Sequence, residues 1–277
     1  MVRIHLFEIE DQQWCPKLFR DYLTDFLRQF ESMTNVYKDA LPIIEKGLKL
    51  ASGNRVIDLC SGGSGPWLRL SKGLPNVEVL LTDLYPNKDA IDAISDLANS
   101  SVQYHPESVD ATSVDKSLSG LKTLFGSFHH FKPEQAKQIL LNAVESNEPI
   151  AVFEFTERKF SNLFIQPIGV TLSVLMLTPF IKPFRLSRMF FTYIIPVIPL
   201  MLIWDGYISN LRTYSPKDLK AMTDSLGVDN YEWEYGIKKT KHPFIGITYL
   251  LGYPKVSVNT SKSIQKDQAL AAEMYEG

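Results

Sequence analysis

The chain of 277 residues has almost no excess charge of either sign and only two cysteines. Its formal net charge is −2, whereas a dedicated nucleic-acid-binding domain usually carries a clear basic excess. Cys15 and Cys60 are too few for a disulfide framework, so nothing requires an oxidising compartment. The first eleven residues contain Glu8, Glu10 and Asp11 and no long apolar run, which is not typical of a secretory signal. We therefore expect a cytoplasmic protein that does not bind nucleic acid.

Acidic residues are absent from one long stretch, residues 158–204. Five basic side chains give this stretch a charge of +5, so the rest of the chain carries −7. It contains two apolar blocks, 163–181 and 189–204, and prolines interrupt both, so uninterrupted membrane-spanning helices are not expected. Three interpretations remain: a buried cap, which we favour, a lipid-binding hairpin on a membrane surface, and a transmembrane hairpin.

Outside this stretch, short apolar runs alternate with amphipathic helical patterns. Helices are predicted at 15–30, 37–50, 66–72, 87–98, 133–145 and 215–226. Strands are predicted at 55–60, 77–82, 102–105, 121–125, 149–155, 231–237 and 244–252. The alternation of strand and helix predicts an α/β protein in which crossover helices connect parallel strands.

The most informative segment is residues 56–67, VIDLCSGGSGPW. A predicted buried strand contains Asp58, and a turn follows at Gly62, Gly63 and Gly65. Glycines allow positive φ and let a ligand approach the backbone. We expect the following helix to aim its N-terminal amides at that ligand. The next apolar run ends in Asp83, placed to accept hydrogen bonds from a ribose diol. An ordinary strand–helix turn is the alternative, and the G-x-G-x-x-G spacing of dinucleotide enzymes is absent.

The run DLCSGGSG resembles the first motif, D/E-x-G-x-G-x-G, of class I S-adenosylmethionine-dependent methyltransferases. Cys60 and Ser61 stand where Gly and Cys are common in that motif, and Ser64 interrupts the glycines. The resemblance implies a Rossmann-like fold, a seven-stranded, mostly parallel sheet with helices on both faces. It also implies a core formed by residues 51–160 and 213–253, a mainly helical cap formed by residues 1–50 and the insertion 161–212, and a polar tail at 254–277.

The same resemblance implies S-adenosylmethionine as cofactor and assigns its binding residues. Asp83 would bind the ribose hydroxyls, and Asp110 would accept a hydrogen bond from the adenine amino group. The predicted binding set is Asp58, Cys60, Ser61, Gly62, Gly63, Gly65, Asp83, Leu84, Asp110 and Ala111.

Two adjacent histidines are the candidate catalytic residues. The run LFGSFHHF at 124–131 resembles the "HH" stretch of quinone- and sterol-type small-molecule methyltransferases. A histidine pKa of about 6.5 suits proton removal near neutrality, so His129 or His130 could be a general base. Packing at the exit of the strand is the alternative. No group of His, Cys and Asp has metal-ligand spacing, so no metal is expected.

The sequence thus predicts methyl transfer to a small, lipophilic acceptor. Two alternatives remain open: a non-catalytic S-adenosylmethionine-binding protein with an altered motif, and a membrane-associated interaction protein. The apolar, basic insertion would suit a hydrophobic substrate, or peripheral contact of residues 163–204 with a membrane of anionic lipids.

Overall fold

A seven-stranded sheet forms the centre of the computed structural model, which describes residues 2–86, 88–96, 100–241 and 245–255. The strand order is β3-β2-β1-β4-β5-β7-β6. The strands are β1 (Arg55–Asp58), β2 (Glu78–Leu81), β3 (Val102–Tyr104), β4 (Leu121–Phe125), β5 (Ile150–Glu154), β6 (Tyr231–Lys239) and β7 (Gly246–Pro254). The first five strands pair in parallel, and β7 runs antiparallel to both β5 and β6. The predicted mostly parallel, Rossmann-like sheet is therefore confirmed.

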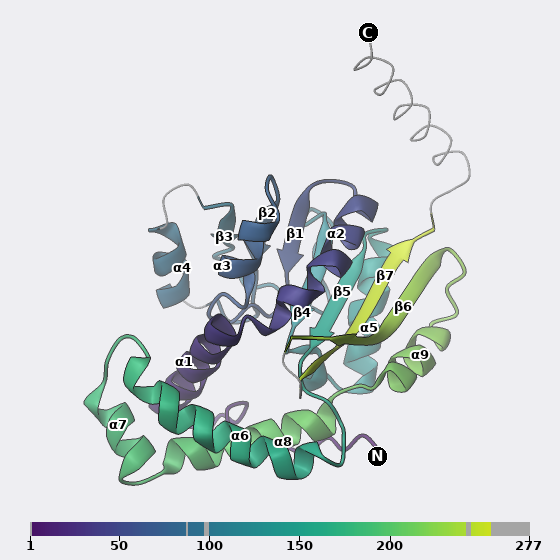
Figure 1. Cartoon of the computed structure of the whole chain (residues 1–277). Coiled ribbons are helices and arrows are strands. Elements are labelled where there is room, and N and C mark those ends of the chain that lie inside the picture. Colours follow the sequence, from purple (N-terminus) through teal and green to yellow (C-terminus); the bar gives the residue numbers. More distant parts are fainter. Residues whose placement is uncertain (1, 87, 97–99, 242–244, 256–277) are drawn as a thin grey trace.

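Helices cover both faces of this sheet, as predicted (Figure 1). Alternate residues of a strand point to opposite faces, so Val56 packs under Ile44 of α2 while Ile57 packs under Ile139 of α5. The helices on the first face are α2 (Leu41–Leu50), α3 (Trp67–Leu70) and α4 (Lys88–Ser95). Those on the second face are α5 (Pro133–Glu145) and α9 (Pro216–Asp224). Three short 3₁₀ turns also lie in or beside this core, η1 (Val36–Ala40), η2 (Ser71–Gly73) and η3 (Phe128–His130).

A separate layer of helices lies at the end of the sheet where the parallel strands finish (Figure 1). It consists of α1 (Lys17–Thr34), α6 (Asn162–Leu177), η4 (Thr178–Phe180), α7 (Leu186–Tyr193) and α8 (Val197–Arg212). We call this layer the helical cap. Tyr22 and Phe26 of α1 form its apolar core with Val174 of α6 and Ile198 of α8. The cap is thus held together by its own hydrophobic cluster.

The predicted cap range 1–50 differs from this arrangement in one respect. Tyr37 of η1 and Ile44 of α2 belong to the cluster against the sheet, so the cap takes α1 from this range but not α2. Residues 161–212 do form cap helices. The division of the chain into domains stays a prediction, and most of the predicted tail, residues 256–277, lies outside the described residues.

The apolar insertion folds into short helices. Among the described residues, no single helix is long and apolar enough to cross a membrane. Helices α7 and α8, which meet at a bend of 72°, are together long and apolar enough by length and composition alone.

Candidate functional site

Asp58 ends β1 and braces the turn that follows it. The Ser61 hydroxyl donates to Asp58 Oδ2 at 2.6 Å, and the Thr123 hydroxyl donates to Oδ1 at 2.7 Å. Thr123 is available because the parallel register sets it beside Asp58 on the neighbouring strand β4. Burial raises the pKa of Asp58 to about 6, although these hydrogen bonds oppose the shift. The carboxyl group therefore connects the glycine turn to the centre of the sheet.

The glycine turn itself contains backbone conformations that most residues avoid. Gly62 and Gly65 each have φ of +52°, and Cys60 has φ of +59°. Burial raises the pKa of the Cys60 thiol, and nearby carboxylates raise it further, so this cysteine is not an activated nucleophile. The helix predicted at 66–72 is shorter than expected, because α3 covers only Trp67–Leu70 before a 3₁₀ turn. One helical turn contributes little dipole, so the amides of the turn, rather than α3, would face a ligand.

Asp83 follows β2 and contacts the glycine turn directly. Its Oδ2 accepts a hydrogen bond from the Gly62 amide at 2.9 Å, and its Oδ1 accepts one from the Tyr85 amide at 2.9 Å. Leu84, beside it, is exposed. The structure therefore brings together the two sequence features, glycine turn and acid, that pointed to a nucleotide.

Asp110 and Ala111 lie on the next loop along the same edge of the sheet. The Asp110 carboxylate is exposed and accepts hydrogen bonds from the Thr112 amide and hydroxyl, at 2.8 and 2.7 Å. It is close enough for its charge to raise the pKa of Cys60. Ala111 is buried in the cluster beneath the sheet. In this structure Asp110 therefore shapes its own loop, and contact with a ligand stays a prediction.

A cleft of about 350 Å³ opens beside the glycine turn, within the size range of small-molecule sites. Six of the ten predicted binding residues line it: Asp58, Cys60, Ser61, Gly62, Gly63 and Gly65. Ser127 lines it from the exit of β4, with its hydroxyl hydrogen-bonded to the Cys60 side chain, which also lines the cleft.

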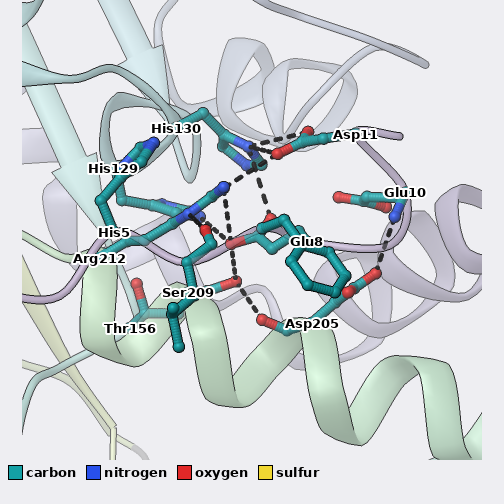
Figure 2. Close-up of polar contacts among 12 residues, drawn as sticks. His5, Glu8, Glu10, Asp11, His129, His130, Thr156, Asp205, Ser209 and Arg212 are labelled. Atoms are coloured by element: carbon teal, nitrogen blue, oxygen red, sulfur yellow. Dashed lines mark hydrogen bonds and ion pairs between the residues drawn. The ribbon is translucent and has the colours of Figure 1, made fainter. Parts of the chain in front are cut away.

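An ionic cluster closes one side of the cleft (Figure 2). The extended N-terminal segment brings Glu8 and Asp11 to Arg212, at the end of α8, and to His130. The Arg212 guanidinium lies 3.2 Å from Glu8 Oε1 and 2.9 Å from Asp11 Oδ2. Asp205 of α8 fixes the same segment by accepting the amide of Glu10 at 3.1 Å. These contacts hold the N-terminal segment against the cap.

The two histidines differ in their environments. His129 is buried, and its Nδ1 donates to Glu154 Oε2 at 2.8 Å, while its Nε2 lies 3.7 Å from Glu8 Oε1. His130 lines the cleft, and its Nδ1 lies 3.2 Å from Asp11 Oδ1. Burial alone would lower the pKa of His130, but Asp11 and the charges of neighbouring acids outweigh burial and raise it to about 9. At neutral pH His130 is therefore a cation and a poor proton acceptor.

Glu8, His129 and His130 offer ligand atoms within 4.8 Å of one another, an arrangement that could hold a metal ion. The Arg212 guanidinium pairs with Glu8 in the same cluster, and its positive charge opposes a metal cation at this position. In this structure the side chains form an ion-pair network.

Three carboxyl groups that the sequence did not assign to the site line the cleft: Asp11, described above, and Glu10 and Glu31. Burial is the largest cause that raises the pKa of Glu10 and that of Glu31 to about 7. Glu31 lies on α1, four residues after Leu27 and eight after Leu23, which belong to the apolar stripe of the helix. An acid on an apolar stripe is the sequence signal that could have identified it.

No protein-family model and no curated protein matches this sequence. Solved structures do match. The plantazolicin methyltransferase BpumL in complex with SAH aligns with a TM-score of 0.55 at 11% identity, covering 89% of this chain and 93% of that one. The plantazolicin methyltransferase BamL, in complex with SAH and a triazolic desmethylPZN analog, aligns with a TM-score of 0.52 at 10% identity. This alignment covers 87% of this chain and 99% of BamL. The chain therefore has the class I S-adenosylmethionine-dependent methyltransferase fold, as the motif resemblance predicted.

Proposed function

We propose that this protein transfers a methyl group from S-adenosylmethionine to a small, lipophilic acceptor. The observation that carries the proposal is the hydrogen bond between the Asp83 carboxylate and the Gly62 amide, because it joins the acid after β2 to the glycine turn. The SAH bound in BpumL and BamL, which share this fold, supports the same cofactor here.

The residues around the cleft fit such a donor. Gly62 and Gly65 present backbone without side chains to a ligand in the cleft. We assign the ribose hydroxyls to Asp83 and the adenine to the Asp110 loop. When bound, the sulfonium supplies an already activated methyl group, so the protein mainly aligns the reactants and excludes water.

When methylation requires the acceptor to lose a proton, a side chain of the protein must take up that proton. The acceptor's lone pair would take up the methyl group that the donor supplies, and a proton on the acceptor would leave to a base of the protein. Glu31 suits this role better than His130, because it lines the cleft and has a pKa of about 7 rather than 9. His129 would position the neighbouring loop through its bond to Glu154.

The character of the acceptor follows from the walls of the cleft. Leu27, Phe125 and Phe131 contribute apolar surface beside the polar turn. A small, lipophilic molecule with one polar reacting group fits this lining. We propose that the protein is cytoplasmic and that it works at a membrane surface; the apolar and basic side chains that the helical cap exposes support only the second part.

Isothermal calorimetry with S-adenosylmethionine and with its demethylated product tests the proposal. We expect both to bind, and Asp83→Ala to weaken binding about 5- to 150-fold, as loss of charge-assisted hydrogen bonds should. Asp92→Ala, an exposed site on α4, is the matched control. Absence of binding by the unmodified chain would refute the proposal. Binding without transfer to any small acceptor would instead support the non-catalytic alternative.

A further inference from the structure

The helical cap exposes an unusual amount of apolar surface. Sixteen of the 26 large apolar side chains that are exposed in the described residues lie between Phe160 and Trp204. We call the part on α6, η4, α7 and the adjoining loops the apolar face. It comprises Phe164, Ile165, Ile168, Leu172, Leu175, Met176, Phe180, Phe184, Leu186, Phe190, Ile194 and Ile195.

Helix α6 shows why this face is not an ordinary protein surface. Its inner side, with Val170, Val174 and Leu177, packs into the cap. Its outer side, with residues such as Ile168 and Leu172, is equally apolar, and the helix contains no charged residue. A helix at a protein–water boundary is normally polar on its outer side. So many exposed apolar side chains on neighbouring cap helices are typical of a surface that binds something else.

The charge beside the apolar face is positive. Lys182 and Arg185 are exposed in the loop between η4 and α7, flanking Phe184. In the described part of the chain, neither forms an ion pair with an acidic side chain. The two arginines of residues 158–204 whose side chains are buried are neutralised, Arg158 by Asp218 and Arg188 by Asp25. The outward-facing charge is therefore cationic and lies next to aromatic and aliphatic side chains.

We propose that the apolar face docks the protein on an anionic lipid bilayer. Short helices with apolar outer sides can lie in the plane of the interface while nearby lysine and arginine contact anionic headgroups. A second copy of this chain fits less well, because a two-fold interface brings the same patch against itself and would oppose the Lys182 and Arg185 charges of the two copies.

A second cavity lies between this face and the glycine turn and shares lining residues with the cleft, and this step rests on the proposed methyl transfer. The cavity measures about 470 Å³ and is lined by Phe180 and Lys182 on the cap side and by Ser64 and Gly65 on the glycine turn. Glu31 lines both this cavity and the cleft. A lipophilic acceptor leaving the bilayer beside Phe180 therefore enters a space that leads to Glu31 and the glycine turn.

Vesicle co-sedimentation of the full chain tests the docking. We expect the protein to pellet with phosphatidylglycerol-containing vesicles and to remain in the supernatant with pure phosphatidylcholine. The double variant Ile168→Ser/Leu172→Ser should lose at least about tenfold in vesicle affinity, since each change removes buried apolar area. Lys182→Gln/Arg185→Gln should lose about fivefold per residue on anionic vesicles. The matched control is Ile237→Ser, an exposed apolar site on β6.

Each outcome decides the inference. Pelleting that is weakened by both cap variants and not by the control supports it. An unmodified chain that stays in the supernatant with anionic vesicles overturns it. So does sedimentation velocity showing a dimer that Ile168→Ser/Leu172→Ser dissociates, since the face would then join two copies. Donor calorimetry separates the two proposals: vesicle binding without donor binding refutes methyl transfer alone, and donor binding without vesicle binding refutes docking alone.

Discussion

Replacing Glu31 by glutamine should stabilise the folded protein at alkaline pH and leave its stability almost unchanged in acid. The reason is the raised pKa of this carboxyl group, about 7 against a usual 4.5, which burial in α1 causes together with the charge of Asp58. Glutamine has nearly the same shape but cannot ionise. The variant therefore removes the free-energy cost of ionising a buried acid and little else.

The direction and size of the effect follow from proton linkage. Below pH 4.5 Glu31 is protonated in both the folded and the unfolded chain, so it carries no penalty. As the pH rises towards 7 the unfolded chain ionises first, and the folded state loses stability relative to it. Above pH 7 the full penalty is present. A pKa raised from 4.5 to about 7 corresponds to a loss of roughly 3 kcal/mol in the free energy of unfolding. Residual exposure of the Glu31 side chain reduces this loss to about 2–3 kcal/mol.

Urea unfolding at pH 5 and pH 8 measures this difference. We expect Glu31→Gln to exceed the unmodified chain by less than about 1 kcal/mol at pH 5 and by about 2–3 kcal/mol at pH 8. Glu45→Gln, at an exposed position on α2, controls for the chemistry of the substitution. A stability difference that is the same at both pH values would refute the assignment of a buried, near-neutral carboxyl group at this position.

Three further predictions concern the turn and the ionic cluster. Arg212→Met leaves Glu8 and Asp11 without their buried partner, so the free energy of unfolding in urea at pH 7 should fall by about 3–5 kcal/mol. An unchanged urea midpoint would show that the ion pairs of Arg212 contribute nothing to stability. Gly65 has φ of +52°, so Gly65→Ala should lower the free energy of unfolding by about 1–2 kcal/mol and weaken binding of the demethylated donor. Thermal unfolding with and without that ligand measures both effects. The His130 imidazole should titrate near pH 9 by NMR and near its ordinary value in Asp11→Asn; an unmodified midpoint at or below 6.5 would contradict the contact with Asp11.

The sheet and its crossover helices were predictable because their signals are local. Helix α5 begins and ends where the sequence predicted, since Pro133 suits the first turn and the Gln135 side chain accepts the Lys132 amide. The helix predicted at 37–50 instead divides into η1 and α2 at Leu41–Pro42. Leu41 is itself helical, and Pro42 lies in the first turn of α2, where its missing amide breaks no hydrogen bond, so this position favours the start of a new helix.

The candidate site was predictable only in part, for a physical reason. The glycine turn and Asp83 each follow a strand, so their position at one edge of the sheet follows from parallel topology. The ionic cluster has no such local signal, because Asp11 meets Arg212 across 201 residues of chain. Pairing over that distance depends on how the N-terminal segment crosses α8, which no periodicity in either segment specifies.

The absence of acids from residues 158–204 explains how the ion pairs of this stretch are arranged and why its outer surface is cationic. With no acid between these residues, their basic side chains can form ion pairs only with acids that lie outside the stretch. The Arg158 guanidinium contacts Asp218 of α9 in the core, and the Arg188 guanidinium contacts Asp25, which joins α7 to α1 within the cap. Lys182 and Arg185 remain exposed, so their charge is directed to solvent or to a partner. One compositional feature thus directs the ion pairs of the stretch to other parts of the chain and gives the outer surface of the cap an attraction for anions.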